Sequence, residues 1–401
     1  MGIEIDTGVE KFLWEYGVSV QTGELPLQPT TRLDAVFVTH AHLDHSAMLP
    51  HLYRIGYRGS VYGDPATFGF TSILYRDYLK LQKRFGFPLN FLIEDVKRME
   101  RNIRFLRPGE SEDFTASTIR FHNAGHIPGS VMIELETHGK HILFTGDVKF
   151  IDTRLMTGAV KKFENIDVII SESTYHYTNH PDRKGLEREF RKVVCETIEN
   201  GGICLIPAFA VGRTQELLLM LEDLDYPIYL DGMGIHATES VLRHPKSIRD
   251  HKKLQRAFSK AHKIRRSVER ERILKKPSVI ITTAGMLNGG PVVYYMERLH
   301  DREDSSIVLT GYQVEGTAGR TLLDTGRFVV NDMDIKPKMK IFFFDFSAHT
   351  DRNHLLEFYN KVCPEKILLI HGEKTDEFAK ELKNMGFDAY APSNGETFKL
   401  I

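Results

Sequence analysis

The sequence has few of the features that mark membrane, secreted or disulfide-stabilised proteins. No run of about 18 apolar residues occurs in the chain, so no membrane-spanning helix is expected. The N-terminal stretch MGIEIDTGVE has neither the basic start nor the apolar core of a secretory signal, and a cytoplasmic protein is expected. The cysteines Cys195, Cys204 and Cys363 form no CxxC pair, which argues against a disulfide framework and against a thiolate zinc site.

An excess of charge of either sign is also missing. The chain has 53 Lys and Arg residues against 54 Asp and Glu residues, so its net charge indicates no class of partner. A local basic stripe can still bind nucleic acid on a neutral protein. One stretch, residues 243–276, is heavily basic, and it is either such a stripe or a solvated helix face.

No internal repeat or low-complexity linker interrupts the chain, which instead alternates short apolar runs with longer amphipathic stretches. This alternation predicts an α/β protein. Strands are expected in runs rich in Val, Ile and Phe at residues 34–39, 117–124, 140–147, 167–173, 202–209, 278–285, 306–312, 340–346 and 366–372. The three-and-four spacing of apolar residues predicts helices at Thr71–Lys83, Ile93–Phe105, Leu186–Asn200, Thr214–Asp223 and His354–Lys361.

Polar side chains suited to chemistry directly follow several of the expected strands. They are residues 40–45, His126, Asp147, Glu172, His349 and His371. In α/β proteins the loops at the C-terminal ends of strands converge on one edge of the sheet. We therefore expect these side chains to form a single site.

The densest group is HAHLDH at residues 40–45, where one loop supplies three imidazoles and a carboxylate. One tetrahedral zinc ion cannot accept so many ligands from so tight a turn, but two ions about 3.5–4 Å apart can share them. The first two histidines can face one ion, and Asp44 and His45 the other. Further ligands are expected among the other strand-end residues, and a carboxylate such as Asp147 can bridge. Zinc is the metal expected for a set so rich in imidazole.

These motifs resemble those of the metallo-β-lactamase superfamily. Its HxHxDH, third and fourth motifs are matched by HAHLDH at 40–45, AGHIPGS at 124–130 and TGD at 145–147. Motifs A, B and C of its β-CASP branch are matched by SESTY at 171–175, FSAHTD at 346–351 and LIHGE at 369–373. A closer resemblance, to the nuclease subunit of the eukaryotic pre-mRNA 3′-end cleavage factor and its archaeal KH-less counterparts, rests on PAFAVGRTQELL at 207–218, TTAGMLNGGP at 282–291 and TGYQVEGTAGR at 310–320.

The resemblance implies a metallo-β-lactamase αββα sandwich with an inserted α/β β-CASP domain. The lactamase domain would comprise residues 1–176 and 345–401, and the β-CASP domain residues 177–344. One departure concerns the start of the chain, which resembles the family's second strand, so that the first strand is expected to be missing. Glu15 stands where the family has Asp, with Asp6 a poorer candidate, which leaves open how the outer shell orients the ligating histidines.

By the same resemblance, the protein is expected to be a ribonuclease that cuts single-stranded RNA with two zinc ions per chain. The ligands implied are His40, His42 and His126 for one ion and Asp44, His45 and His371 for the other, with Asp147 bridging. A hydroxide shared by the ions would attack the phosphorus. His349 would protonate the leaving 3′ oxygen, with Glu172 orienting its ring, and Asp44 and Asp147 complete the catalytic set.

Contacts to RNA are expected from the inserted domain. Arg213 and Arg320 follow glycines in family-like motifs, and the amides at Gly289 and Gly290 precede an expected helix start that could hold a phosphate. The alternatives are a structural ion pair for each arginine and an ordinary helix N-terminus for the glycines.

Other functions stay open at this stage. His371 in motif C favours RNA over DNA as the substrate, because DNA-repair members of the family carry Val there. A DNA-processing nuclease is the nearest alternative. A catalytically inactive RNA-binding subunit and a small-molecule hydrolase of the same superfamily are the others. The sequence does not decide between an endonuclease and a 5′-to-3′ exonuclease. A homodimer is expected, because dimers are common among the relatives.

Overall fold

The structure is a computed structural model that describes residues 1–19, 22–29 and 32–400, and it divides into two compact units. Unit 1 contains Met1–Asp152, Met156–Asn179 and Ala348–Ile401, and unit 2 contains Thr153–Leu155 and His180–Ser347. Across the described ranges, no helix is long and apolar enough to cross a membrane. Each unit has its own sheets and its own hydrophobic core.

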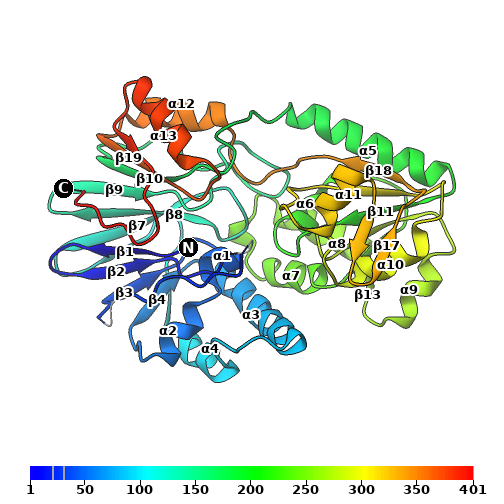
Figure 1. Cartoon of the computed structure of the whole chain (residues 1–401), viewed down its shortest axis with the longest axis horizontal. Coiled ribbons are helices and arrows are strands. Elements are labelled where there is room, and N and C mark those ends of the chain that lie inside the picture. Colours follow the sequence, from blue (N-terminus) through cyan, green and yellow to red (C-terminus); the bar gives the residue numbers. More distant parts are fainter. Residues whose placement is uncertain (20–21, 30–31, 401) are drawn as a thin grey trace. The chain divides into compact units, whose positions relative to one another are not determined.

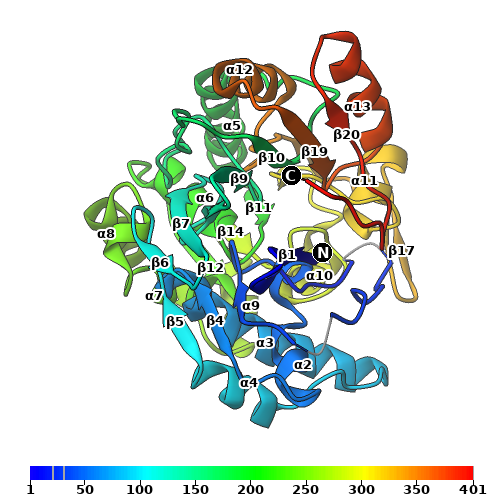
Figure 2. The same cartoon turned by 90° about the vertical axis from the view of Figure 1, so that its left-hand side faces the viewer.

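Unit 1 contains two β-sheets with helices on their outer faces (Figure 1 and Figure 2). One sheet has the order β1-β2-β3-β4-β5, with strands Ile3–Asp6, Lys11–Trp14, Ala35–Phe37, Ser60–Gly63 and Ile103–Phe105. The other has the order β20-β19-β10-β9-β8-β7-β6, with strands Ala389–Tyr390, Lys366–Ile370, Val168–Glu172, Lys140–Phe144, Val131–Thr137, Ser117–Asn123 and Ser111–Asp113. The helices are α1 Leu43–Ser46, α2 Leu49–Arg54, α3 Pro65–Phe85, α4 Ile93–Glu100, α12 Arg352–Val362 and α13 Thr375–Asn384.

Three apolar layers hold unit 1 together. Side chains of both sheets form the middle layer, in which the Trp14 and Phe144 rings stack with centroids 5.6 Å apart. Strand β8 supplies two layers at once: Ile133 points into the middle layer, whereas Met132 points to the layer under α12 and α13. A third layer lies between the β1–β5 sheet and helices α2 to α4. Strand β8 reaches two layers because successive side chains of a strand point to opposite faces of the sheet.

Unit 2 is built on one parallel sheet with the order β13-β12-β14-β11-β15-β18. Its strands are His262–Ile264, Ile228–Asp231, Ser278–Thr282, Ile203–Pro207, Ser306–Leu309 and Lys340–Phe343, and a hairpin is formed by β16 Phe328–Val330 and β17 Met333–Ile335. The helices are α5 Arg183–Glu199, α6 Arg213–Leu221, α7 Gly234–Val241, α8 His251–Lys260, α9 Val268–Ile273, α10 Pro291–Leu299 and α11 Ala318–Thr325. Parallel strands need crossover connections, and these helices provide them.

The α/β fold class and the αββα sandwich with an additional α/β unit are confirmed. Each expected strand run contains an observed strand, and four of the expected helices lie at α3, α5, α6 and α12. The helix expected at Ile93–Phe105 is wrong in its second half. Helix α4 ends at Glu100, and Ile103–Phe105 is β5, which pairs in parallel with β4. Pairing with a distant strand overrides the helical spacing there.

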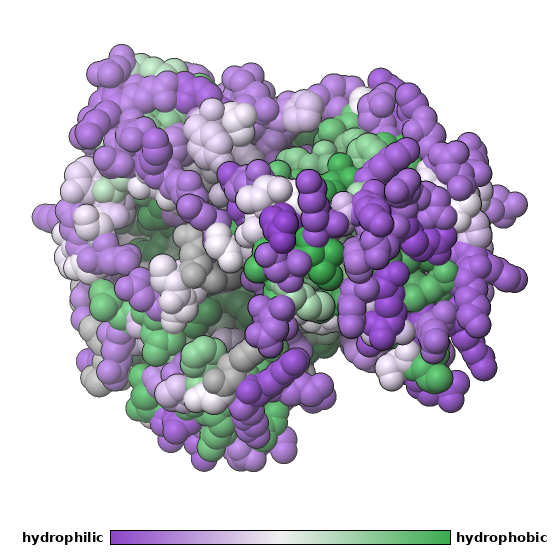
Figure 3. Space-filling view, turned by 45° about the vertical axis from the view of Figure 1, so that its right-hand side comes forward, coloured by the Kyte–Doolittle hydropathy of each residue, from purple (hydrophilic) through white to green (hydrophobic). Residues whose placement is uncertain are grey.

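The basic stretch 243–276 is not one helix but α8, β13 and α9 in succession. Much of its charge is paired: Arg270 with Asp231 at 2.6 Å, Arg265 with Glu239 at 2.6 Å, and Lys253 with Glu222 at 3.3 Å. Figure 3 shows mostly hydrophilic side chains over the visible face of unit 2, with smaller hydrophobic areas between them.

Candidate metal centre

Residues 40–45 follow β3, and close contacts hold this loop in place. The side chain of Ser46 donates to the carbonyl of Ala41 at 2.9 Å, which ties the loop to the start of α1. Gly17 lies against it so closely that an added Cβ would be 1.9 Å from the carbonyl oxygen of Asp44. Gly146, with φ of 51°, likewise has no room for a Cβ, which would lie 2.7 Å from Thr39 Oγ1. Glycine at these two positions allows the neighbouring backbone to approach the loop of residues 40–45 and Thr39 closely.

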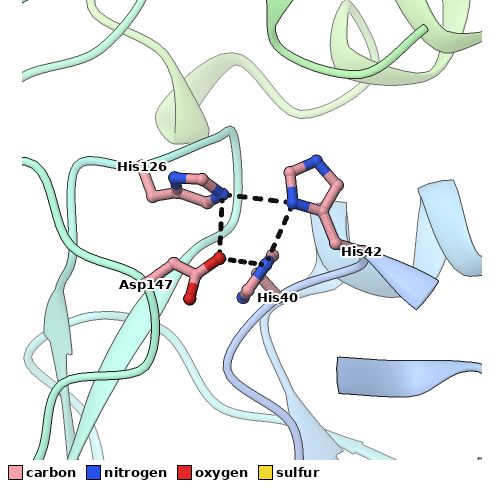
Figure 4. A group of neighbouring side chains, drawn as sticks. All are labelled: His40, His42, His126 and Asp147. Atoms are coloured by element: carbon pink, nitrogen blue, oxygen red, sulfur yellow. Dashed lines mark hydrogen bonds and ion pairs between the residues drawn. The ribbon is translucent and has the colours of Figure 1, made fainter. Parts of the chain in front are cut away.

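A first cluster consists of His40, His42, His126 and Asp147, whose side chains point toward one another in Figure 4. His42 Nδ1 lies 3.2 Å from His40 Nε2 and 3.1 Å from His126 Nε2. The Asp147 Oδ2 atom lies 3.3 Å from His40 Nε2 and 3.5 Å from His126 Nε2. Three imidazole nitrogens and one carboxylate oxygen around one point are a ligand set typical of zinc.

A second cluster adjoins the first and consists of Asp44, His45 and His371. His371 Nε2 lies 3.1 Å from Asp44 Oδ2, and His45 Nε2 lies 3.6 Å from the same oxygen. The other carboxylate oxygen of Asp147, Oδ1, lies 3.3 Å from His45 Nε2 and 3.4 Å from His371 Nδ1. Asp147 therefore presents one oxygen to each cluster, as a bridging ligand must.

The polar atoms of these clusters fit metal ions. In the described part of the chain, both ring nitrogens of buried His45 and Oδ1 of Asp147 have no hydrogen-bond partner, although buried polar atoms normally have one. Burial, with the nearby His45, lowers the pKa of His40 to about 3, so this ring is neutral and can donate a lone pair to a metal. Three carboxylates, from Asp147, Asp44 and Glu15, raise the pKa of His45 despite its burial. Metal cations would neutralise this concentration of negative charge.

His349 and Glu172 form a pair beside the clusters. His349 Nδ1 lies 2.9 Å from Glu172 Oε2, and Glu172 Oε1 accepts a hydrogen bond from the amide of Val148 at 2.6 Å. The other ring nitrogen, Nε2, lies 3.8 Å from Asp147 Oδ2. Burial opposes protonation of His349, but the charges of Glu172 and Asp147 outweigh it and raise its pKa to about 9.

The loop that carries His349 is fixed by the loops that carry His126 and Asp147. His126 Nδ1 lies 3.0 Å from the carbonyl oxygen of Ala348, and the amide of Thr350 donates to Val148 at 2.7 Å. The buried Lys149 donates from Nζ to the carbonyl of His349 at 2.6 Å. Sequence analysis missed Lys149, and its position two residues after Asp147 was the one signal for it.

Glu15 supports the second cluster from behind. It is fully buried, with φ of 64°, and its Oε1 accepts a hydrogen bond from the amide of Thr39 at 2.8 Å. Its Oε2 lies 3.4 Å from His45 Nδ1, on the side of the ring away from Asp44. Asp6, by contrast, pairs with Lys11 at 3.0 Å on the surface. The longer side chain of Glu15 thus reaches a histidine of the second cluster.

Unit 1 brings together all the side chains expected at strand ends: His40, His42, Asp44, His45, His126, Asp147, Glu172, His349 and His371. The residues expected to touch RNA lie in unit 2. Arg213 begins α6 with its guanidinium carbon 5.9 Å from the ring centroid of Phe346, and Arg320 pairs with Asp324 at 2.8 Å. Gly290, with φ of 75°, precedes the first residue of α10, and Gly289 lies next to it.

Known protein families match most of the chain. A "Beta-lactamase superfamily domain" matches residues 3–186, a "Beta-Casp domain" matches residues 214–322, and a "Zn-dependent metallo-hydrolase RNA specificity domain" matches residues 334–392. The chain is similar in structure, with a TM-score of 0.62 and 13% identity, to a protein of unknown function from Enterococcus faecalis over 98% of this chain and 95% of that one. At that identity the likeness concerns the fold alone.

Three of the curated relatives come from archaea. The chain is 36% identical to "Probable RNase MJ4" of Methanocaldococcus jannaschii, over 99% of this chain and 96% of that protein. It is 34% identical to "RNase aCSPSF2" of Saccharolobus solfataricus, over 99% of this chain and 82% of the relative. It is 35% identical to "Transcription termination factor FttA" of Methanothermobacter thermautotrophicus, over 99% of this chain and 69% of the relative.

Proposed function

This chain belongs to the β-CASP family of the metallo-β-lactamase superfamily, and from that premise we propose that it hydrolyses phosphodiester bonds of single-stranded RNA at the paired clusters of unit 1. It is a metal-dependent ribonuclease, since relatives matched over nearly the whole chain are named RNases and a zinc-dependent RNA specificity domain matches residues 334–392. The observation that carries the proposal is Asp147, which presents one carboxylate oxygen to each cluster.

The proposed metal complement is two zinc ions per chain. His40, His42 and His126 would hold one ion, Asp44, His45 and His371 the other, and Asp147 would bridge them. When bound, the ions supply a nucleophilic water of lowered pKa and positive charge against the scissile phosphate. The chain itself contributes the neutral imidazole of His40 and an outer shell of polar side chains: Thr39 Oγ1 lies 3.0 Å from His40 Nδ1, and Glu15 Oε2 lies 3.4 Å from His45 Nδ1.

His349 is the proposed general acid. The carboxylate of Glu172 accepts a hydrogen bond from the Nδ1–H group of His349, which fixes the orientation of the ring and leaves Nε2 beside Asp147 Oδ2. From that position Nε2 would deliver a proton to the leaving 3′ oxygen. The negative charge of Glu172, which is itself held by the amide of Val148, favours the protonated ring. The hydrogen bond from Lys149 Nζ to the carbonyl oxygen of His349 holds the backbone of His349 in place.

We propose residues 1–176 and 345–401 as the metallo-β-lactamase domain and residues 177–344 as the β-CASP domain. Within the latter, Arg213 and Arg320 are proposed to contact RNA phosphates, together with the amides at Gly289 and Gly290. We further propose a cytoplasmic location, in keeping with the three sparse cysteines, which are free thiols in the structure. A homodimer is proposed as well.

The alternative of a DNA-processing nuclease is weakened by the RNA specificity domain match. The alternative of an inactive RNA-binding subunit is weakened because every side chain of both clusters is present. An RNase name for two relatives at 34–36% identity also argues against a small-molecule hydrolase.

The test uses one single-stranded RNA, labelled at its 5′ end in one tube and at its 3′ end in another, with and without a chelator. Internal fragments that disappear with chelator indicate an endonuclease, and single nucleotides released from the 5′ end indicate an exonuclease. A DNA oligonucleotide of the same sequence is the control for substrate class. A zinc-loaded protein that cleaves neither RNA would contradict the proposed activity.

A further inference from the structure

The segment that follows β10 carries two tyrosines, Tyr175 and Tyr177, whose rings are linked by contacts to His349. Tyr175 is buried, whereas 54% of Tyr177 is exposed. The Tyr175 ring lies 6.3 Å from the His349 ring, with 39° between the planes. The Tyr177 ring lies 6.3 Å from the Tyr175 ring, with 26° between the planes. The rings of His349, Tyr175 and Tyr177 therefore form a chain of contacts, and Tyr177 is the most exposed of the three.

Other contacts hold the backbone on both sides of Tyr177. The His176 ring stacks on Phe378 with centroids 4.7 Å apart, and its Nε2 lies 2.8 Å from the carbonyl oxygen of Glu373. Arg352 donates to the carbonyl of His176 from Nη1 and to the carbonyl of Thr178 from its amide, both at 3.1 Å. An exposed ring on a backbone fixed in this way loses little conformational freedom when it binds a ligand.

Exposure alone does not distinguish Tyr177. Phe87 and Phe105 of unit 1 are 60% and 57% exposed. However, Phe87 follows α3 and Phe105 lies in β5, and neither element carries a residue of the two clusters. Among these three rings, Tyr177 is the one joined through Tyr175 to His349.

We propose that Tyr177 is a stacking platform for one unpaired base of the RNA, next to the phosphate that is cut. The inference rests on the proposed ribonuclease function and adds a substrate contact to it. A single strand bound at the clusters offers the π-faces of its bases on either side of the scissile phosphate. Aromatic side chains bind such faces without regard to base identity, and the neutral ring of Tyr177 adds no phosphate contact.

Steady-state cleavage by the zinc-loaded full chain tests the contact. Tyr177→Ala is expected to raise KM for single-stranded RNA by about 5- to 150-fold, the range found for other aromatic residues that stack on a base. The value of kcat should stay the same, because the lost interaction is made equally in the ground and transition states. Tyr177→Phe keeps the ring and should behave as the wild type. Phe87→Ala, an equally exposed ring away from the clusters, is the matched control.

Salt dependence separates stacking from charge. Loss of a phosphate contact reduces the slope of log affinity against log salt by about one, whereas loss of a stacked ring leaves the slope unchanged. In addition, RNAs with one abasic nucleotide at successive positions should reveal one position where the wild type loses affinity and Tyr177→Ala does not. If no position behaves in this way, the stacking contact is refuted.

A spectroscopic readout is independent of turnover. Trp14 is the single tryptophan of the chain and is fully buried, so Tyr177→Trp adds one exposed fluorophore. Stopped-flow mixing with RNA should quench its emission before cleavage. One outcome is that the wild type cleaves RNA, that Tyr177→Ala has an unchanged KM, and that RNA does not quench the fluorescence of Tyr177→Trp. This outcome would refute the stacking contact of Tyr177 and leave the proposed ribonuclease activity in place. If RNA quenches the fluorescence of Tyr177→Trp but no chelator-sensitive cleavage occurs, the stacking contact is supported and the proposed ribonuclease activity is refuted.

Discussion

At the scale of single residues, the two ring nitrogens of His45 contact different groups. His45 turns Nε2 toward the oxygens of Asp44 and Asp147, while Nδ1 faces Glu15. The same division occurs in His349, with Glu172 on one side and Asp147 on the other. In each case a buried carboxylate behind the ring sets which nitrogen is available at the site.

Replacement of Glu15 should weaken zinc binding without abolishing it. Outer-shell carboxylates of this kind typically change metal affinity by about 10- to 100-fold. Competition with a chromophoric chelator should show such a loss for Glu15→Gln, and no loss for Asp6→Asn, which removes a surface carboxylate of the same β1–β2 region. Unchanged zinc affinity in Glu15→Gln would contradict the assigned role.

His349→Ala should slow cleavage while the zinc content stays intact. A positioned general acid typically contributes about 10²- to 10⁴-fold to the rate, so kcat should fall within that range. Elemental analysis of the purified variant gives the zinc content, and His42→Ala is the comparison in which metal is lost. Loss of metal from His349→Ala would instead assign this histidine to the metal shell.

At the scale of elements, the β7–β9 strands share a buried carboxylate away from the metal centre. Glu134 of β8 lies 2.6 Å from His122 Nε2 on β7 and 2.9 Å from His141 Nδ1 on β9. Burial raises the pKa of Glu134, but the hydrogen bonds from both histidines outweigh this effect and lower it to about 2 from 4.5. The folded state thus binds the Glu134 proton more weakly than the unfolded state does.

The contribution of Glu134 to stability is therefore present above pH 4.5 and disappears as the pH falls toward 2. For Glu134→Gln, we expect a free energy of unfolding about 1–3 kcal/mol below that of the wild type near neutral pH. Plots of the free energy of unfolding against pH for the wild type and Glu134→Gln should converge between pH 4.5 and pH 2. Urea unfolding of both proteins without metal measures the difference, and parallel curves down to pH 2 would contradict it.

Many elements could be predicted from the sequence because their signals are local. Strand β10, Val168–Glu172, is buried throughout, and the polar Glu172 stands at its C-terminal end, where a site forms. The end of α4 could not be predicted, because β5 exists only through its pairing with β4. Glu15 and Lys149 acquire their roles from loops distant in sequence, and no spacing pattern records such contacts.

At the scale of the whole molecule, every candidate ligand lies in unit 1 and none of them in unit 2. A ligand that binds only the folded state stabilises the unit that holds it, by about 4 kcal/mol at 1,000 times its dissociation constant. Calorimetry should therefore show two transitions, of which only one moves to lower temperature when a chelator removes zinc. His42→Ala should abolish that shift. An equal shift of both transitions would contradict independent units.

The insertion of unit 2 into unit 1 also fixes the order in which a growing chain can complete its fold. Strand β10 pairs with β19 in the register Val168 to Lys366, so its partner is synthesised about 200 residues later. At about 5–20 residues per second, β10 emerges from the ribosome roughly 10–40 s before the strand that completes its sheet. His371 follows β19 directly, so the cluster of Asp44, His45 and His371 is the last part of the candidate site to be assembled.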